Sequence, residues 1–131
     1  MKKTILLSGK TLHLRIADGF FSRARGLLGR KLGADEGLLI TPCMAVHTFA
    51  MGYPLDVVFL DRDHQVVKTV SSLQPWRTAG AAGAHAVLEL SSGQAAQYGL
   101  SPGTVLPGMG RDDHPANLLA ADGADRQKNS G

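Results

Sequence analysis

Two apolar runs joined by a short polar loop constrain the fold of this chain more than any other part of the sequence. The first run, at residues 55–60, reads LDVVFL, and the second, at residues 65–70, reads QVVKTV. The loop between them, DRDH, has the composition of a turn. Two strand-like runs separated by so short a loop predict a β-hairpin.

The two faces of the first run are both largely apolar. Successive residues of a strand point to opposite faces. One face therefore carries Leu55, Val57 and Phe59, and the other carries Asp56, Val58 and Leu60. This pattern is typical of a strand that is covered on both sides. In the second run, the same alternation predicts that Val66, Lys68 and Val70 share one face.

Shorter strand patterns recur along the rest of the chain. They fall at residues 4–7, 11–17, 37–41, 85–90 and 104–106. Two short helices are expected, one that follows Asp18 and ends at Gly29 or Gly33, and one over 93–98. Sixteen glycines and an aromatic content of only 5% favour short strands and turns. We therefore expect a mainly β fold, a single small jelly-roll-like β-sandwich or open barrel with two short helices.

The 131 residues suit one domain. We expect residues 1–106 to form it, and residues 107–131, rich in Gly, Asp and Asn, to form a disordered polar tail. The apolar run near the start, ILL, is too short for a signal peptide or a membrane span. We therefore expect a cytoplasmic, monomeric protein with no membrane insertion.

Charge and cysteine content exclude several kinds of site. The net charge is only +3 and the basic residues are scattered, whereas a nucleic-acid surface needs a basic face with interleaved aromatic residues. A single cysteine excludes an internal disulfide and a zinc site with several cysteines. We expect no nucleic-acid partner and no cofactor.

Cys43 and His47 are the first candidates for chemistry, either as a nucleophile with its base or as two metal ligands. Met51, Asp56 or Glu89 could serve as a third partner, and Cys43, His47 and Met51 would be a soft set for copper(I). In an extended segment, residues four apart lie about 13 Å apart along the strand. The pair therefore requires a turn over residues 44–46. The alternative is a buried structural thiol and a hydrogen-bonded histidine.

Asp56 and Glu89 are the second pair of candidates, because two carboxyl groups could act as a general acid and base. Asp56 also has a simpler interpretation. It lies on a strand face otherwise made of Val58 and Leu60, where a carboxylate without hydrogen-bond donors is too costly to keep. We expect its carboxylate to be held by hydrogen bonds inside the domain.

The long loop expected at residues 71–83 contains Trp76, the only tryptophan, followed by Arg77. Long loops of compact domains are often functional, although a tryptophan also commonly anchors a loop to the core. If the protein has a site, we expect it where this loop meets the segment 43–51. Ligand contacts would come from Cys43, His47 and the Trp76–Arg77 pair.

Four ordered segments resemble the family catalogued as domain of unknown function 192. They are GLLGRKLGADEGLLI, HTFAMGYPLDVVFLDRDHQVVKTV, the proline of LQPW, and VLELSSGQAAQYGLSPGTVL, and they span about residues 20–106. The resemblance implies a small, mainly β domain similar to a jelly roll. It also implies export in many members, and the spacing of Cys43 and His47 is similar to a subgroup encoded near pilus-assembly genes.

Two functional classes follow from these observations. The first is a non-catalytic binding or accessory module for a protein, peptide or small ligand, with a pilus or secretion component among the candidate partners. The second is a small enzyme or metal-binding protein that uses Cys43 and His47. We favour the first, because no constellation in the sequence meets a catalytic geometry. The resemblance carries no catalytic residues to transfer.

Overall fold

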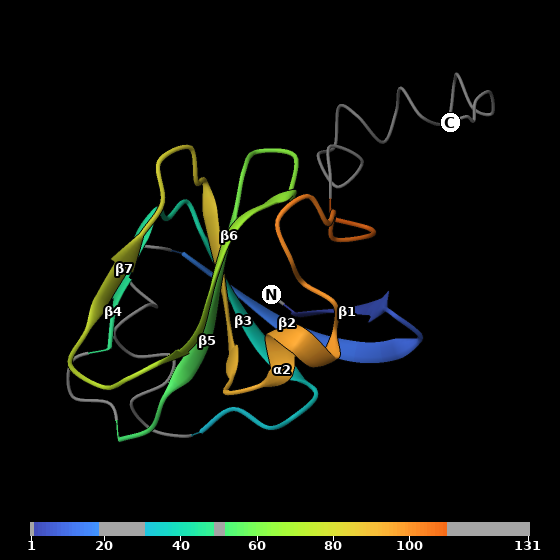
Figure 1. Ribbon diagram of the computed structural model, residues 1–131. Helices are drawn as coiled ribbons and strands as arrows, with labels where there is room; N and C mark the ends of the chain where they lie inside the picture. Colours follow the sequence, from blue (N-terminus) through green and yellow to red (C-terminus); the bar gives the residue numbers. More distant parts are fainter. Residues whose placement is uncertain (1, 19–30, 49–51, 110–131) are drawn as a thin grey trace, which may run out of the picture.

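A six-stranded sheet in the order β1-β2-β3-β8-β5-β6 forms the centre of the molecule (Figure 1). The computed structural model describes residues 2–18, 31–48 and 52–109. The strands of this sheet are β1 (Lys2–Leu7), β2 (Lys10–Asp18), β3 (Glu36–Thr41), β8 (Ala86–Ser91), β5 (Leu55–Leu60) and β6 (Val66–Leu73). Neighbours are antiparallel except β2 and β3, which are parallel. The mainly β fold is confirmed, with open sheets that do not close into a barrel.

The central strand β5 has the two buried faces that its sequence predicts. All six of its residues are buried. Leu55, Val57 and Phe59 join one hydrophobic cluster, and Val58 and Leu60 join another on the opposite side of the sheet. The prediction of a strand covered on both sides is therefore confirmed.

The C-terminal part of the domain covers one side of the sheet, which we call the α2 face. The helix α2 (Gln94–Gln97) lies within the predicted range 93–98 and is shorter. After it, Tyr98, Leu100, Leu106 and Met109 are buried against the sheet. The buried cluster thus reaches Met109, beyond the expected boundary at 106. No helix in the described part of the chain is long and apolar enough to cross a membrane.

Of the remaining predictions, the last strand is wrong and the first helix concerns residues that the structure does not describe. The predicted strand at 104–106 is wrong, because only an isolated bridge between Gln65 and Val105 forms there. The helix expected after Asp18 lies outside the described residues.

A second, two-stranded sheet covers part of the other side, which we call the β4–β7 face. It pairs β4 (Ala45–His47) with β7 (Thr78–Gly80). Val46 and Ala79 from these strands pack on the cluster formed by Leu55, Val57 and Phe59. The prediction that 71–83 is a continuous loop is wrong, because its first residues extend β6 and its middle forms β7.

The predicted hairpin of β5 and β6 is confirmed, but its second strand is irregular. Leu60 pairs with Val66 and Phe59 pairs with Lys68, so one residue of β6 has no counterpart in β5. Such a bulge reverses the faces of the side chains that follow it, up to a second register shift between the Val57–Val70 and Leu55–Leu73 pairs. Val66 therefore packs on the α2 face, while the Lys68 amino group lies 5.8 Å from the centre of the Phe59 ring on the opposite face. The prediction that Val66 shares a face with Lys68 is wrong for this reason.

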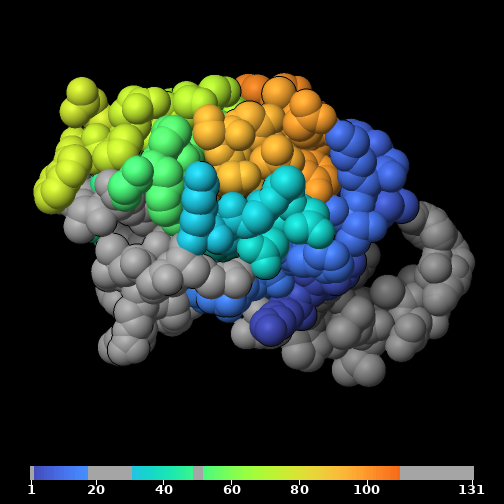
Figure 2. All heavy atoms as spheres, turned by 90° about the horizontal axis from the view of Figure 1, so that it is seen from below, coloured from blue at the N-terminus to red at the C-terminus, as the bar shows by residue number. Residues whose placement is uncertain are grey.

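Figure 2, viewed from below, shows the segment before β3 and the start of β3 in cyan. This part of the surface lies between the β1–β2 hairpin, in blue, and the beginning of β5, in green. The β1–β2 hairpin therefore forms one end of the molecule. In Figure 1, the β4–β7 layer lies at the opposite end.

Candidate functional site

The two segments expected to form a site do meet in the structure. Residues of β4 pair with residues of β7 in the register Ala45–Gly80, Val46–Ala79 and His47–Thr78. The segment 43–48 and the segment 76–81 therefore lie side by side as one small sheet. Met51, which the sequence offers as a third partner for Cys43 and His47, lies outside the described residues.

Thr48 connects these two segments, a role that the sequence did not indicate. It is fully buried. Its amide donates to the Arg77 carbonyl at 2.8 Å, and its carbonyl accepts the Trp76 amide at 3.0 Å. Its hydroxyl donates to the Gln74 carbonyl at 2.6 Å and accepts the Arg77 amide at 2.9 Å. Four hydrogen bonds to one residue therefore fix the backbone over residues 74–77.

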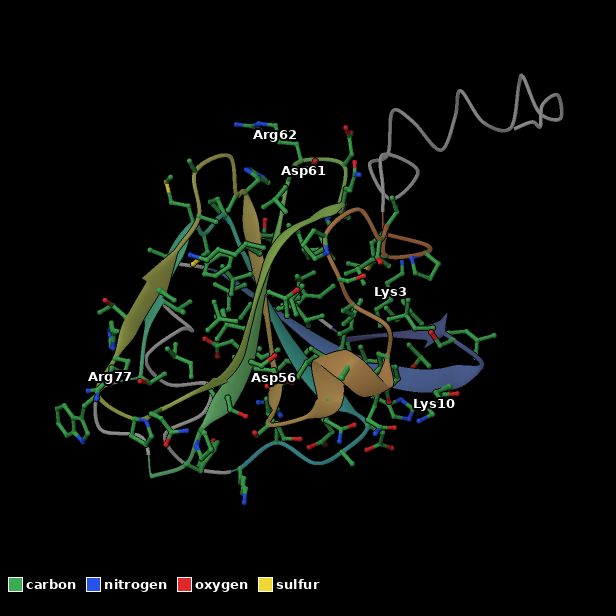
Figure 3. All side chains as sticks on the ribbon, in the orientation of Figure 1. Lys3, Lys10, Asp56, Asp61, Arg62 and Arg77 are labelled. Atoms are coloured by element: carbon green, nitrogen blue, oxygen red, sulfur yellow. The ribbon has the colours of Figure 1, made fainter. Side chains whose placement is uncertain are left out.

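Trp76 projects from this fixed backbone toward solvent. Its side chain is 62% exposed, and its φ of 65° lies in the left-handed region. Arg77 is also exposed, and Figure 3 places it at the outer edge of the β4–β7 layer, far from Asp56. The loop anchor predicted as one role of the tryptophan is provided instead by Thr48.

Cys43 and His47 differ in their surroundings although both flank or lie in β4. Cys43 is buried in the cluster of the β4–β7 face, and its thiol donates to the Ala45 carbonyl at 3.1 Å. His47 is exposed and lies opposite Thr78, at the same end of the small sheet as Trp76. A buried, hydrogen-bonded thiol behaves as a small apolar side chain.

The described residues also lack a metal-binding constellation. Within residues 2–18, 31–48 and 52–109, no three or more His, Cys, Asp or Glu side chains are grouped closely enough to hold a metal ion. This distribution gives the Cys43–His47 pair no third ligand among these residues.

Asp56 is held inside the domain by two backbone amides, as predicted. It is 1% exposed; its Oδ1 accepts the Ser72 amide and its Oδ2 accepts the Ala95 amide, each at 2.8 Å. These bonds connect β5 to the end of β6 and to α2. The carboxylate therefore stabilises the junction of three elements.

The paired-carboxylate alternative is wrong, because Asp56 and Glu89 point to opposite faces of the sheet. Asp56 lies opposite Leu90, and Glu89 lies opposite Val57. Residues directly opposed in an antiparallel pair share a face. Asp56 consequently lies on the α2 face with Leu90, and Glu89, which is 2% exposed, lies on the β4–β7 face with Val57.

The amino-acid sequence matches an uncharacterised protein family and a relative from an archaeon. The profile of DUF192, described as an uncharacterized ACR, matches residues 3–108. The UPF0127 protein PH1112 of Pyrococcus horikoshii is 39% identical over 70 residues, which make up 50% of this chain and 59% of that protein. The matched region thus spans little more than half the length of this relative.

Two solved structures share the fold. A protein of unknown function from Novosphingobium aromaticivorans superposes with a TM-score of 0.67 at 28% identity, over 81% of this chain and 83% of its own. A candidate transcription regulator from Sinorhizobium meliloti 1021 superposes with a TM-score of 0.67 at 25% identity, over 80% of this chain and 89% of its own.

Proposed function

The chain belongs to the uncharacterised family DUF192, and we propose that it is a non-catalytic binding module that recognises a partner protein or peptide through Trp76 and Arg77. The observation that carries this proposal is the exposed tryptophan held on a left-handed backbone. Its side chain is 62% exposed at a φ of 65°.

Holding Trp76 in this conformation opposes folding. The left-handed region costs a non-glycine residue about 1–2 kcal/mol, and an exposed indole gains little from burial. The four hydrogen bonds of Thr48 offset this cost and keep residues 74–77 in place. Glycine or asparagine would satisfy the backbone at this position more easily. Strain that is kept with an exposed aromatic side chain supports a role in recognition.

The shape of the site favours a macromolecular partner over a small molecule. A small ligand needs a concave site that buries most of its surface, whereas Trp76 protrudes from the end of the β4–β7 layer. Tryptophan and arginine are the side chains most enriched at the energetic centre of protein interfaces, where they fill pockets of the partner. Met44, another exposed apolar side chain, lies at the other end of this layer, beside Ala81, and is not part of the proposed contact.

The alternative of a small enzyme or metal protein built on Cys43 and His47 has less support. A nucleophilic thiol must reach its substrate, and Cys43 is buried with its thiol donating to the Ala45 carbonyl. His47 is suited instead to the rim of the proposed contact, because it is exposed at the same end of the small sheet as Trp76.

The same proposal includes the setting in which the module works. We propose a cytoplasmic monomer with a reduced jelly-roll-like sandwich, in which the β4–β7 sheet is the smaller layer. A component of a pilus or secretion system remains a candidate partner. Cell fractionation and light scattering of the purified protein would test the location and the monomeric state.

The experiment compares the unaltered protein with Trp76→Gly. Glycine relieves the left-handed backbone but makes the unfolded chain more flexible, so the free energy of unfolding should change by less than about 1 kcal/mol. Binding to a partner recovered by crosslinking and then purified should fall at least about tenfold, the size of a modest interface hot spot. The matched control is Leu6→Ala, which removes a side chain that is 64% exposed in β1.

Two results would contradict the proposal. A loss of several kcal/mol of stability in Trp76→Gly would show that the indole serves folding. Equal partner binding by the Trp76→Gly and Leu6→Ala variants would show that the tryptophan is not the contact.

A further inference from the structure

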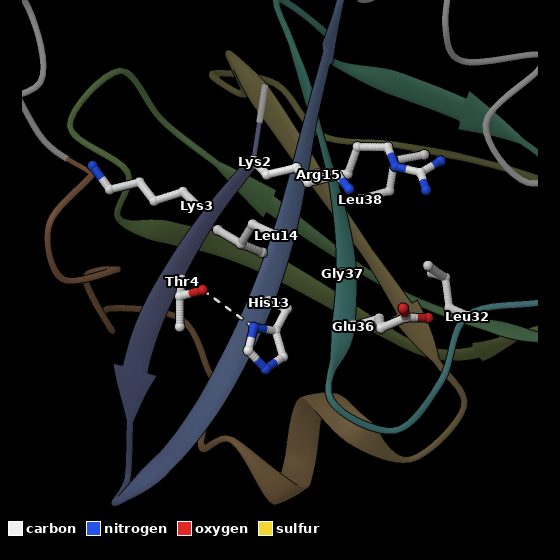
Figure 4. A pocket seen from close by; sticks show the side chains of 10 residues that line it. All are labelled: Lys2, Lys3, Thr4, His13, Leu14, Arg15, Leu32, Glu36, Gly37 and Leu38. Carbon is white, nitrogen blue, oxygen red and sulfur yellow. Dashed lines mark hydrogen bonds between the residues drawn. The ribbon is translucent and has the colours of Figure 1, made fainter.

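We propose that a groove at the other end of the molecule, over β1, β2 and β3, binds a small organic anion that carries a short apolar chain. The groove has a volume of about 340 Å³. The side chains that matter here are Lys2, Thr4, His13, Arg15, Glu36 and Leu38 (Figure 4). This site is separate from the Trp76 contact and involves none of its residues.

Strand register places the two main cations of the groove next to each other. Lys2 lies directly opposite Arg15 in the β1–β2 pair, and Arg15 lies beside Leu38 in the β2–β3 pair. The three side chains therefore form one row on the β4–β7 face, to which Leu38 belongs. Figure 4 shows Lys2 and Arg15 extending from their strands toward β3, whereas Lys3 points the other way.

Two like charges in directly opposed positions destabilise an antiparallel pair. Neither the Lys2 nor the Arg15 side chain forms a hydrogen bond or ion pair with any residue within 2–18, 31–48 or 52–109. The sheet thus keeps an unfavourable contact that no described neighbour relieves. Local conflicts of this kind are expected at functional sites, where a ligand supplies the missing interaction.

Of the acidic side chains nearby, Glu36 itself lines the groove, on the side of Leu32 (Figure 4). The Glu36 carboxylate accepts the Gly33 amide at 2.8 Å. Asp35 lies 3.8 Å from the Nε2 atom of His13, whose Nδ1 atom is 3.1 Å from the Thr4 hydroxyl. The groove therefore carries positive charge at the row of Lys2 and Arg15 and a carboxylate on the side of Leu32, so an anion would bind at the row of the two cations.

The apolar part of the groove begins at Leu38, next to Arg15, and continues to Leu32, beside Glu36 (Figure 4). Leu38 is 2% exposed and Leu32 is 7% exposed, and both line the groove. A carboxylate could bind the planar guanidinium of Arg15 through two hydrogen bonds and contact the Lys2 ammonium. An aliphatic chain attached to it would then lie along the leucines. The volume is at the lower end for ligand sites, which favours a small molecule over a peptide or nucleotide.

Titration of the full chain with octanoate, followed by amide resonances in NMR spectra, tests this inference. We expect saturable shifts at Lys2, Arg15 and Leu38. Neutral octanol and inorganic phosphate, which each supply only one half of the proposed ligand, should bind at least about tenfold more weakly. Equal binding of octanol would overturn the anionic part of the proposal, equal binding of phosphate would overturn the apolar part, and absence of octanoate shifts would overturn both.

Matched charge variants distinguish this site from a general effect of net charge. Arg15→Gln should weaken octanoate binding by about tenfold, the effect of losing one charge-assisted pair. Arg62→Gln removes the same charge from the exposed β5–β6 turn, at the top of Figure 3, and should leave the affinity unchanged. Equal weakening by both variants would overturn the proposal.

The melting temperature of the protein tests the repulsion between Lys2 and Arg15. Without ligand and at low salt, Arg15→Gln should melt at a higher temperature than the unaltered protein, because it removes the repulsion from Lys2. A lower melting temperature would show that Arg15 stabilises the fold. Trp76→Gly should leave octanoate binding intact, so a failure here and a failure of the proposed function are separable.

Discussion

Replacing Asp56 with alanine should strongly destabilise the domain, because the buried carboxylate accepts hydrogen bonds from two backbone amides. The carboxylate is 1% exposed and accepts the amides of Ser72 and Ala95. Leaving a buried donor without its acceptor costs about 1–3 kcal/mol. Ala95 is 2% exposed, so the cost for its amide should lie near the upper end of this range. Ser72 is partly exposed, so the cost for its amide should lie near the lower end. The expected loss is therefore about 3–4 kcal/mol.

The control is Asp61→Ala, which removes the same kind of interaction from an exposed turn. The Asp61 carboxylate also accepts two amides, those of Asp63 at 2.8 Å and Gln65 at 3.0 Å. Water can replace it there, so the expected loss is about 1 kcal/mol. Asp56→Asn should cost nearly as much as Asp56→Ala, because its amide can accept only one of the two donors and turns its own N–H groups toward the other.

Urea denaturation followed by circular dichroism measures these differences. A lower midpoint with an unchanged slope would report a loss of stability in the folded state. The reasoning is refuted if Asp56→Ala loses no more stability than Asp61→Ala, since it depends on the burial of the Asp56 carboxylate and of the Ala95 amide.

Three further predictions concern other parts of the chain. Burial, reinforced by the Asp35 carboxylate, raises the pKa of Tyr98 above its ordinary value of 10.0. Because the folded protein holds this proton more tightly, the neutral phenol contributes to the free energy of unfolding. The contribution is fully present below pH 10 and is lost as the pH rises through the raised pKa. Tyr98→Phe, measured by urea denaturation at pH 8 to 11, should therefore reduce the alkaline loss. Gly37→Ala should cost about 1–3 kcal/mol by overpacking, because its methyl group would meet three leucine side chains at 3.0–3.1 Å; an unchanged midpoint would contradict this. Deleting 110–131 should move the melting temperature little, as their polar composition predicts, and a drop of several degrees would mean that they pack on the domain.

The predictions that succeeded depend on residues close together in the sequence. The two apolar faces of β5 can be recognised from six consecutive residues. The same pattern placed Asp56 on a buried face, from which its need for hydrogen-bond donors follows. The identity of the donors could not be predicted, because Ser72 and Ala95 reach the carboxylate only through the pairing of β6 and the position of α2.

The predictions that failed depend on register between distant segments. A single extra residue in β6 reverses Val66 relative to Lys68, and nothing in a run of valines marks where the pairing shifts. The sequence alone leaves Asp56 and Glu89 as a possible carboxylate pair, but the β5–β8 register places them on opposite faces of the sheet. The row of Lys2, Arg15 and Leu38 is likewise created by register, so the groove could not be predicted from residues that are close in the sequence.

The position of β8 has a consequence for how this chain folds on the ribosome. β8 lies between β3 and β5, yet it follows both in the sequence. Until residues 86–91 have emerged, the β1–β3 unit and the β5–β6 hairpin have no strand to join them, and each exposes an apolar edge. Such edges are prone to pair with other chains. We therefore expect nascent chains that end before β8 to need protection by chaperones, and the domain to fold in one late step when the last central strand is inserted.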